Sequence, residues 1–243
     1  MRHLLVINPN TGQATTDRLQ SWISGLLPAD VNLQCITARF GAPYIACEAS
    51  AAVAGHALLD AWADHISHHN DQPDGVLIAC FGDPGLFALR ASSACPVSGL
   101  AEASFIEASD KGPFAIVTGG AHWPVMLRRL AQSLGFDQQL TAIEVVQETG
   151  AQLLADRDLA LRVLAQACEK AASSGAQSII MGGAGLAGYA QALQDRVSLP
   201  LIDSVSAGVH LYLQQRMPPA IQSRNAFESA WHHLPAHMNL TSR

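Results

Sequence analysis

The stretch Val76-Leu77-Ile78-Ala79-Cys80-Phe81-Gly82 reads as an apolar strand that ends in a thiol and a glycine. A related pattern returns 103 positions later, from 76 to 179, as Ile179-Ile180-Met181-Gly182-Gly183-Ala184-Gly185. Short, continuously apolar runs of this kind are typical of strands that are buried on both faces of a parallel sheet. The two stretches therefore predict equivalent strands in two related halves of the chain.

Two further junctions recur in the same order along the chain. Residues 5–9 match residues 115–119 after a shift of 110 positions, and residues 96–99 match residues 200–203 after a shift of 104. Self-similarity at nearly constant spacing indicates a repeated architecture. We therefore expect three strand-to-loop junctions of the first half to have counterparts in the second half.

Apolar runs alternate with helical patterns through most of the chain. Strands are expected at 3–7, 31–37, 75–80, 96–99, 113–118, 140–145, 177–182 and 199–202. Helices are expected at 12–27, 46–69, 121–134, 156–173, 205–216 and 224–233. This alternation predicts an α/β fold with two pseudo-symmetric, flavodoxin-like parallel-sheet halves.

We expect the first half to comprise residues 1–95 together with 205–243, and the second half to comprise residues 96–204. Ligands of open parallel sheets collect outside the carboxyl ends of the strands. The active-site cleft is therefore expected between the two halves.

Composition narrows the classes of function. Charged residues make up 14% of the 243 residues, hydrophobic residues make up 49%, and the formal net charge is −6. No block of Lys or Arg offers a surface to a phosphate backbone, so nucleic-acid binding is not expected. No apolar run approaches the roughly 18 residues of a membrane-spanning helix, and Asn8 comes too early for a signal peptide. We therefore expect a cytoplasmic protein with no nucleic-acid or membrane partner.

Cofactor chemistry has little support in the sequence. The only lysines, Lys111 and Lys170, lie away from strand ends, which argues against a Schiff base with pyridoxal phosphate. Six of the ten histidines gather at residues 65–69 and 232–237, without carboxylate or thiol ligands at metal spacing. We therefore predict no metal site.

Cys80 is the strongest candidate for chemistry. It follows an apolar strand and precedes residues 81–85, which turn into a helix with Pro84 near its first position. A thiol there would face backbone N–H groups and the positive end of a helix dipole, which predicts a lowered pKa. The alternative is a small buried hydrophobe, the usual role of a free cysteine. The other cysteines lie within strand or helix patterns or beside a proline and are expected to be structural: Cys35, Cys47, Cys95 and Cys168.

The glycine-rich junction at residues 182–188 ends a second strand and opens a helix. Glycines there would expose backbone N–H groups to a carboxylate, a phosphate or an oxyanion, but close helix–strand packing explains them equally well. Asn8, and Thr118 with Gly119, end two more strands, where each could be no more than a helix cap.

Three motifs together resemble the aspartate/glutamate/hydantoin racemase superfamily, in particular its hydantoin and allantoin racemase branch. They are Cys-Phe-Gly-Asp-Pro-Gly-Leu at 80–86, Ile-Asn-Pro-Asn-Thr at 7–11 and Ile-Asp-Ser-Val at 202–205. The likeness extends from Leu5 to about Val209. It implies two pseudo-symmetric α/β halves, no cofactor, a homo-oligomer, and two cysteines that act on opposite faces of a substrate carbon.

The resemblance also assigns individual residues. It places the first catalytic cysteine at Cys80 and a substrate contact at Asn8, and it makes Thr118 and Gly119 part of an anion-binding loop. The second family cysteine falls at Gly183, which has no side chain, so the symmetric two-thiol mechanism is not available. The groups expected to bind substrate and stabilise an enolate are the backbone donors of Phe81, Gly82, Gly183 and Ala184, with Thr118 beside them.

Several interpretations remain for a chain with one of the two thiols. His122, Glu148 or a water could supply the second proton. Alternatively, Cys80 could protonate a carbanion on one face after decarboxylation, as in the arylmalonate decarboxylases, although these keep the second cysteine instead. Cys80 could also attack carbon covalently, as the maleate isomerases of the superfamily are thought to do. A non-catalytic protein that binds small anions is the alternative from another class.

We predict a cofactor-independent racemase or epimerase that transfers the Cα proton at Cys80. Its small-molecule partner would be an amino-acid derivative or hydantoin-like compound with a carboxylate or ring carbonyls. The Cα–H of a hydantoin is acidic, so its removal needs the least stabilisation by the enzyme. This favours a ring substrate over a free amino acid.

Overall fold

The computed structural model describes residues 2–69, 71–148 and 150–240, and these form two compact units. The first unit falls within Met1–Gly99 and Tyr212–Arg243, and the second is Leu100–Leu211. The predicted boundaries after residues 95 and 204 differ from these, because residues 97–99 pair with the first sheet and the helix after Asp203 stays with the second unit almost to its end. Of the predicted halves, residues 1, 70, 149 and 241–243 lie outside the described part of the chain.

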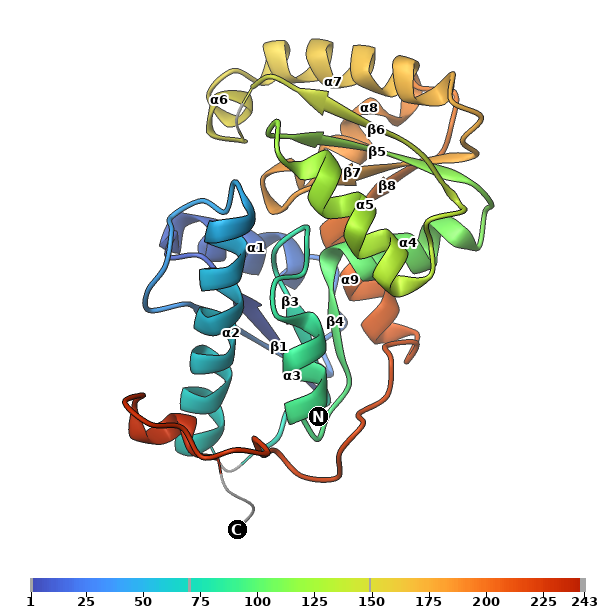
Figure 1. The fold of residues 1–243 in the computed structure, drawn as a ribbon. Helices are drawn as coiled ribbons and strands as arrows, with labels where there is room; N and C mark the ends of the chain where they lie inside the picture. Colours follow the sequence, from blue (N-terminus) through green and yellow to red (C-terminus); the bar gives the residue numbers. More distant parts are fainter. Residues whose placement is uncertain (1, 70, 149, 241–243) are drawn as a thin grey trace. The chain divides into compact units, whose positions relative to one another are not determined.

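The first unit is built on a four-stranded parallel sheet (Figure 1). Its strand order is β2-β1-β3-β4. The strands are β1 (Arg2–Asn8), β2 (Val31–Thr37), β3 (Gly75–Ile78) and β4 (Val97–Gly99). Leu4 to Ile7 of β1 are at most 1% exposed, as expected for a central strand covered on both faces.

Three helices connect these strands: α1 (Gln13–Ser24), α2 (Glu48–His68) and α3 (Leu86–Ser92). The path from β1 to β2 runs in one direction across the sheet, and the paths to β3 and β4 run in the other. Because crossover connections are right-handed, α2 and α3 cover one face of the sheet and α1 covers the opposite face. The contact between α2 and α3 agrees with this arrangement.

The second unit repeats this topology. Its sheet order is β6-β5-β7-β8, the order of the first sheet with every strand number raised by four. The strands are β5 (Phe114–Gly119), β6 (Leu140–Val146), β7 (Ser178–Gly182) and β8 (Leu201–Asp203). The alternation and the repeat seen in the sequence are thus confirmed as an α/β fold, and each of the eight strands lies within two residues of its predicted range.

Helices cover both faces of the second sheet as well. They are α4 (Leu100–Ser109), α5 (Trp123–Leu134), α6 (Gly150–Ala155), α7 (Arg157–Ala172), α8 (Tyr189–Leu193) and α9 (Ser204–Leu213), with short 3-10 turns η1 (Ala184–Leu186) and η2 (Gln194–Arg196). Leu164 and Cys168 of α7 belong to a buried apolar core with Val117 and Met181 of the sheet. No helix in the described ranges is both long and apolar enough to cross a membrane.

The prediction of a helix at residues 224–233 is wrong. This segment forms no helix, and the next regular element is the 3-10 turn η3 (Ala236–Met238). Its backbone is held by contacts outside the segment instead: Ala226 N–H donates to Ser92 O at 3.2 Å, and Phe227 N–H donates to Leu240 O at 3.1 Å. A helix of about ten residues is marginal alone, so these tertiary hydrogen bonds decide its conformation.

A buried carboxylate anchors η3 to the first unit. Asp60 of α2 is 1% exposed and accepts hydrogen bonds from Arg39 Nη2 at 2.8 Å to each of its oxygens. His237 Nε2 lies 2.7 Å from Asp60 Oδ1. Burial alone would raise the pKa of Asp60, but the hydrogen bonds from His237 and Arg39 outweigh it and hold the pKa below the usual range of an aspartate.

Near the end of α2, His65 is buried without a polar partner. It is 3% exposed, and neither ring nitrogen makes a hydrogen bond within the described residues. Its ring stacks on His69 with centroids 4.3 Å apart and lies 6.3 Å from the ring of His3. Burial, together with the charges that His69 and His3 can carry, lowers the pKa of His65 from 6.5 to about 4.

This arrangement predicts acid sensitivity. Because the folded-state pKa is depressed, the unfolded chain binds the extra proton between pH 6.5 and 4, and stability falls as the pH falls through that window. We expect the depressed pKa of His65 to lower the unfolding free energy by about 2 kcal/mol as the pH falls from 7.5 to 5. Urea unfolding of His65→Leu should show a matching loss of pH dependence, whereas His68→Leu on the exposed side of the same turn should keep it. An unchanged pH dependence in His65→Leu would contradict this assignment.

Candidate active site

Two neighbouring strands carry candidate residues to the carboxyl edge of the first sheet. β1 and β3 pair in parallel with Ile7 opposite Ile78, and Ala79 N–H donates to Ile7 O at 2.9 Å. The segments that begin with Asn8 and Cys80 therefore leave the sheet side by side, as the sequence predicted for this half.

Cys80 lies two residues beyond the end of β3, in a tight turn. Asp83 N–H donates to Cys80 O at 3.1 Å, which places Phe81 and Gly82 at the two corners. Gly82 has φ 144° and Asp83 has φ 48°, so two successive residues leave the conformations that L side chains prefer. Glycine removes the steric cost at the first of these positions, and backbone strain at a non-glycine residue such as Asp83 is typical of functional sites.

The carboxyl group of Asp83 packs directly against the end of β4. Asp83 is 3% exposed, and a Cβ built on Gly99 would overlap its carboxyl group. Only glycine at position 99 leaves room for this buried acid beside the Cys80 turn. Asp83 was not among the site residues predicted from the sequence, because its proximity to Gly99 depends on the pairing of β3 with β4.

The predicted lowering of the Cys80 pKa is wrong. Cys80 is 8% exposed, and burial raises the pKa of its thiol, with the negative charge of Asp83 adding to the effect. The helix that was expected to stabilise a thiolate begins only at Leu86 and has seven residues, so its dipole is short and displaced from the sulfur. In this environment Cys80 rests as a neutral thiol, which is a proton donor.

Cys47 has the opposite electrostatics. It is the N-cap residue of the 21-residue helix α2, and hydrogen bonds with Ser50 lower the pKa of its thiol. The pKa values of Cys35, Cys95 and Cys168 are raised, in each case chiefly by burial. Cys47 therefore ionises more readily than these buried thiols, and it provides a natural control for experiments on Cys80.

The side chain of Asn8 is committed to its own loop. Its Nδ2 donates to Thr16 Oγ1 at 3.0 Å and to Asn10 Oδ1 at 3.1 Å, and its Oδ1 accepts from Asn10 N–H at 3.2 Å. Asn10 Oδ1 also accepts from Gly12 N–H at 2.8 Å. In this structure Asn8 shapes the loop that leads into α1, and the substrate contact assigned to it stays a prediction.

In the second unit, Thr118 lies on β5 and Gly183 lies just past the end of the adjacent strand β7, at the equivalent edge. Thr118 pairs with Gly182 in the register of β5 and β7, and its Oγ1 donates to Gly182 O at 2.7 Å. Gly183 N–H donates to Ser204 Oγ at 3.2 Å. The structure therefore brings Thr118 and Gly183 together, but it uses the hydroxyl proton of one and the N–H of the other internally. The N–H of Ala184 opens η1 and lies outside the hydrogen bonds of that turn, so it is the better backbone donor.

Ser204 and Asp203 brace this junction from the end of β8. Ser204 is 1% exposed, and Asp203 accepts hydrogen bonds from Gly188 N–H at 2.7 Å and from Val205 N–H at 3.0 Å. The motif at 202–205 carried a family signal in the sequence, but not these roles. They depend on the pairing of β8 with β7, which the sequence did not disclose.

Gly183 occupies the place in the second unit that Cys80 occupies in the first. Each lies just past the end of the third strand of its sheet, β3 or β7. Gly183 has φ 142°, and a Cβ built on it would find only the side chain of Leu186 within 4 Å, at 3.8 Å. A Cβ at this position therefore has space, whereas the backbone conformation opposes it with strain.

The other candidate proton donors lie in the second unit. His122 is exposed at the start of α5, and Glu148 is half-buried in the segment after β6, with its backbone O 3.0 Å from a Cβ built on Gly119. Within the described ranges, no group of three His, Cys, Asp or Glu side chains could hold a metal ion. The candidate residues lie at the carboxyl edges of two sheets in separate units: Asn8 and Cys80 in the first, and Thr118 and Gly183 in the second. That they share one cleft stays a prediction.

Comparison with known proteins places this architecture among racemases. The family model described as Asp/Glu/Hydantoin racemase matches residues 4–212. A hydantoin racemase of Paenarthrobacter aurescens is 32% identical over 210 residues, which cover 84% of this chain and 86% of that protein. The allantoin racemase from Klebsiella pneumoniae has a similar structure, with a TM-score of 0.84, 27% identity and coverage of 99% and 100% of the two chains. The allantoin racemase from Pseudomonas fluorescens shares the fold at 20% identity, with a TM-score of 0.83 over 95% and 99% of the two chains.

Proposed function

Because the chain belongs to the Asp/Glu/hydantoin racemase family, we propose that it is a cofactor-independent racemase of hydantoin-like compounds, in which Cys80 transfers the Cα proton. The single observation that carries this proposal is the position of Cys80. A buried thiol stands at the carboxyl end of β3, in a turn that strained backbone and a buried acid hold in place. Family membership supports racemisation of a small molecule.

The electrostatics of the turn favour Cys80 as the proton donor on one face of the substrate. A base on the other face removes the Cα proton, the electron pair is delocalised into the adjacent carbonyl, and the Cys80 S–H returns a proton to carbon. The thiolate that remains then removes a proton in the reverse direction. Since burial and Asp83 make this thiolate costly, it forms only when substrate is bound and the proton has somewhere to go.

The substrate class follows from the same cost. A neutral thiol and an unassisted base can deprotonate and reprotonate a carbon acid only when its enolate is already well stabilised. The Cα–H of a hydantoin is flanked by a ring carbonyl and a ring nitrogen, and it ionises more readily than that of a free amino acid. The turn uses only the Asp83 N–H for its own closure, so the Gly82 N–H is free of that role and suits the enolate oxygen.

One observation favours a second candidate function. Gly183 has no side chain, so protonation from Cys80 alone would reach one face of the substrate. A substituted malonate could then lose carbon dioxide, leave its electron pair on Cα as an enolate, and receive the Cys80 proton to give one enantiomer. This decarboxylase would share the site and differ in its product.

A panel of substrates in D2O separates these functions. Nuclear magnetic resonance would follow optically pure 5-substituted hydantoins, allantoin, aspartate, glutamate and a substituted malonate with the wild-type protein. Deuterium entry at Cα with loss of optical rotation supports the racemase, and carbon dioxide loss with one-handed deuteration supports the decarboxylase. Binding of these compounds without exchange or turnover would contradict both and leave a protein that binds small anions.

Gly183→Cys tests the missing second thiol directly. The new Cβ has room, and the φ of 142° at this position is expected to cost about 1–3 kcal/mol of stability. A second acid–base group on the opposite face should raise the racemisation rate at least about 10-fold, within the range of a single positioned group. Gly183→Ala introduces the same strain without a thiol and should show no gain. Equal rates in the two variants would mean that position 183 does not face the substrate.

A further inference from the structure

We propose that an acid at the same place in each sheet, Asp83 in the first and Asp203 in the second, is a positioning residue that keeps the proton on the group just past the third strand. That position, called here the proton-transfer position, is Cys80 in the first unit and Gly183 in the second. The inference rests on the proposed function, because it concerns how the Cys80 proton is held before a substrate binds.

The loops that follow the third strands have the same backbone frame. Asp83 N–H donates to Cys80 O at 3.1 Å in the first unit, and Leu186 N–H donates to Gly183 O at 2.9 Å in the second. The sixth residue of each loop is a glycine in the left-handed region, with φ 79° in the first unit and 85° in the second. Positions 83 and 186 are therefore equivalent in structure as well as in the sequence repeat.

The ends of the fourth strands correspond in the same way. Gly99 of β4 is paired with Ile78 of β3, and Asp203 of β8 is paired with Met181 of β7. Ile78 and Met181 are themselves related by the shift of 103 positions. Gly99 and Asp203 therefore occupy equivalent places, each opposite the strand residue two positions before the proton-transfer position.

The acid has changed places between these two frames. In the first unit the loop supplies Asp83 and the strand has Gly99, whereas in the second unit the loop has Leu186 and the strand supplies Asp203. A Cβ built on Gly99 would overlap the carboxyl group of Asp83. That carboxyl group therefore fills the space where a side chain at position 99 would begin. Both sheets keep a carboxyl group at this junction, although different segments supply it.

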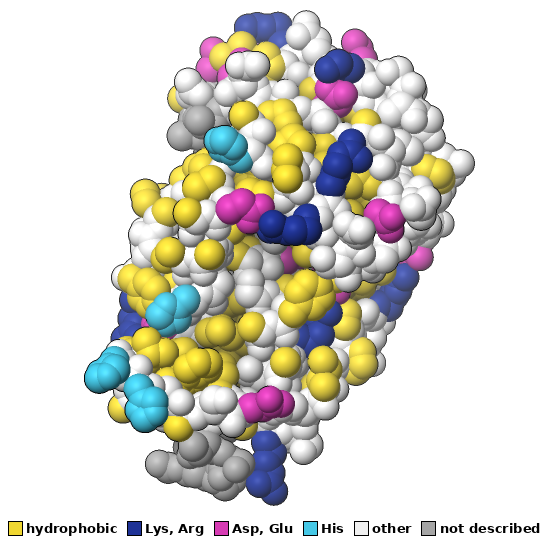
Figure 2. All heavy atoms as spheres, viewed as in Figure 1, with side chains coloured by type: hydrophobic (Ala, Val, Ile, Leu, Met, Phe, Trp, Pro, Cys, Tyr) yellow, Lys and Arg dark blue, Asp and Glu magenta, His cyan; other side chains and the backbone are white. Residues whose placement is uncertain are grey.

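The junction is close enough for a charge to act on the proton-transfer position. Two strand residues span about 7 Å and neighbouring strands lie about 4.8 Å apart, so position 99 lies within about 9 Å of Cys80. Asp83 is 3% exposed, whereas acidic side chains normally stay in water, as those visible in Figure 2 do. Salt and water screen a buried charge much less than an exposed one. The charge of Asp83 accordingly adds to burial in raising the pKa of the Cys80 thiol.

The second acid is held in place by the backbone around it. Asp203 Oδ1 accepts from Val205 N–H and from Ser206 N–H, each at 3.0 Å, and its Oδ2 accepts from Gly188 N–H at 2.7 Å. Burial raises the pKa of this half-buried carboxyl group, and the three hydrogen bonds oppose that effect because they favour the charged form. A thiol introduced at position 183 should therefore hold its proton as Cys80 does.

Alkylation by iodoacetamide at pH 8, followed by peptide mass spectrometry, measures how readily Cys80 loses its proton. Every protein in the series carries Cys47→Ala, because the Cys47 thiol ionises more readily. Asp83→Asn keeps the packing against Gly99 and removes the charge, so Cys80 should react about 3–10-fold faster. A fall of about one unit in the thiol pKa gives about ten times more thiolate, which is somewhat less nucleophilic.

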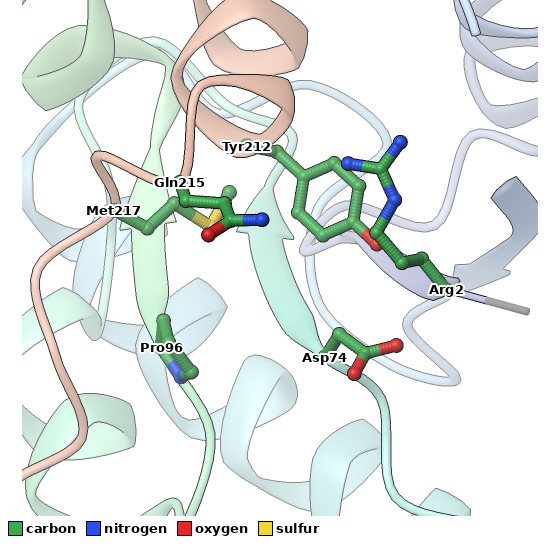
Figure 3. A pocket seen from close by; sticks show the side chains of 6 residues that line it. All are labelled: Arg2, Asp74, Pro96, Tyr212, Gln215 and Met217. Carbon is green, nitrogen blue, oxygen red and sulfur yellow. The ribbon is translucent and has the colours of Figure 1, made fainter. Parts of the chain in front are cut away.

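Asp74→Asn is the matched control for the loss of an acid from the first unit. Asp74 immediately precedes β3, so it lies at the opposite end of that strand from Cys80, beside the pocket that it lines with Arg2 and Tyr212 (Figure 3). Its removal should leave the alkylation rate of Cys80 unchanged.

Moving the acid from the loop to the strand separates its charge from its packing. Asp83→Gly removes the carboxyl group, suits the φ of 48°, and should speed the alkylation of Cys80 at least about 3-fold. Adding Gly99→Asp places an acid where the second unit has one, and should return the rate to within about 2-fold of that with Asp83 in place. Adding Gly99→Asn instead fills the same space without a charge and should not slow the reaction.

The second unit provides an independent test. In a protein with Gly183→Cys, adding Asp203→Asn should speed the alkylation of the introduced thiol about 3–10-fold. Circular dichroism checks that each variant is folded.

An unchanged rate in Asp83→Asn, or equal rescue by Gly99→Asn and Gly99→Asp, would overturn the role given to Asp83. An unchanged rate on adding Asp203→Asn to Gly183→Cys would overturn the role given to Asp203. These rates are measured without turnover. A chain in which Cys80 responds to Asp83 as expected, yet racemises nothing, would therefore fail the proposed function alone.

Discussion

Cys80→Ala is expected to lower the rate of racemisation by about 10²–10⁴-fold, the contribution of one positioned acid–base group. Cys80 is the thiol at the carboxyl end of β3, and the methyl group of alanine can neither give nor take a proton there. The fold should survive, because the Cys80 turn is closed by a backbone hydrogen bond and the shape of Gly82, and not by the sulfur. Polarimetry with an optically pure hydantoin measures the rate, and circular dichroism checks the fold.

Cys47→Ala is the matched control for this experiment. Cys47 has a lowered thiol pKa, so a thiol reagent should modify it before the buried Cys80. If catalysis depended on the most reactive thiol and not on position, Cys47→Ala would lose activity and Cys80→Ala would keep it. We expect the reverse. A loss of less than 10-fold in Cys80→Ala would contradict the role given to Cys80.

Arg39→Met is expected to lower the unfolding free energy by about 2 kcal/mol, less than the roughly 3–5 kcal/mol of a fully buried broken ion pair. The substitution leaves Asp60, which is 1% exposed, with His237 as its remaining ion-pair partner. Methionine keeps most of the apolar stem, so the loss reports on the charge. The Arg39 side chain is 50% exposed, so water reaches the broken pair and moderates its cost.

Urea denaturation at pH 7.5 measures this loss, with Arg18→Met on the exposed face of α1 as the control for losing an arginine. Adding Asp60→Asn to Arg39→Met removes the stranded charge and should restore more than half of the lost free energy. A double variant that is less stable than Arg39→Met alone would show that Asp60 carries no uncompensated charge. The proposed anchoring of η3 by Asp60 would then be wrong.

The parts of the fold that could be predicted from the sequence are those governed by local pattern. Apolar runs such as 76–79 and 179–182 revealed the central strands, because strands covered on both faces have no polar alternation to obscure them. The repeated junctions revealed two related sheets, because the same topology places the same residue types at equivalent strand ends. The shift of 103 positions aligned Cys80 with Gly183, and each lies just past the third strand of its sheet. That Gly183 stands where the family has its second cysteine stays a prediction.

The parts that were missed depend on packing between distant segments. The raised pKa of Cys80 follows from burial and from the charge of Asp83, whose carboxyl group packs against Gly99. Neither can be predicted from the residues that neighbour Cys80 in sequence. The amide of Asn8 is used by Asn10 and Thr16, which a strand-end pattern does not disclose. The segment 224–233 had a helical pattern, but its backbone hydrogen bonds go to Ser92 and Leu240 instead.

The most direct test of the central claim is the fate of the Cα proton in D2O. One optically pure 5-substituted hydantoin is incubated at pH 7 with the wild-type protein or with Cys80→Ala, and proton NMR follows the Cα–H signal. We expect the wild-type protein to remove this signal and the optical rotation together, and Cys80→Ala to change both only at the uncatalysed rate. Equal enzyme-dependent exchange in both proteins would show that the proton does not pass through Cys80.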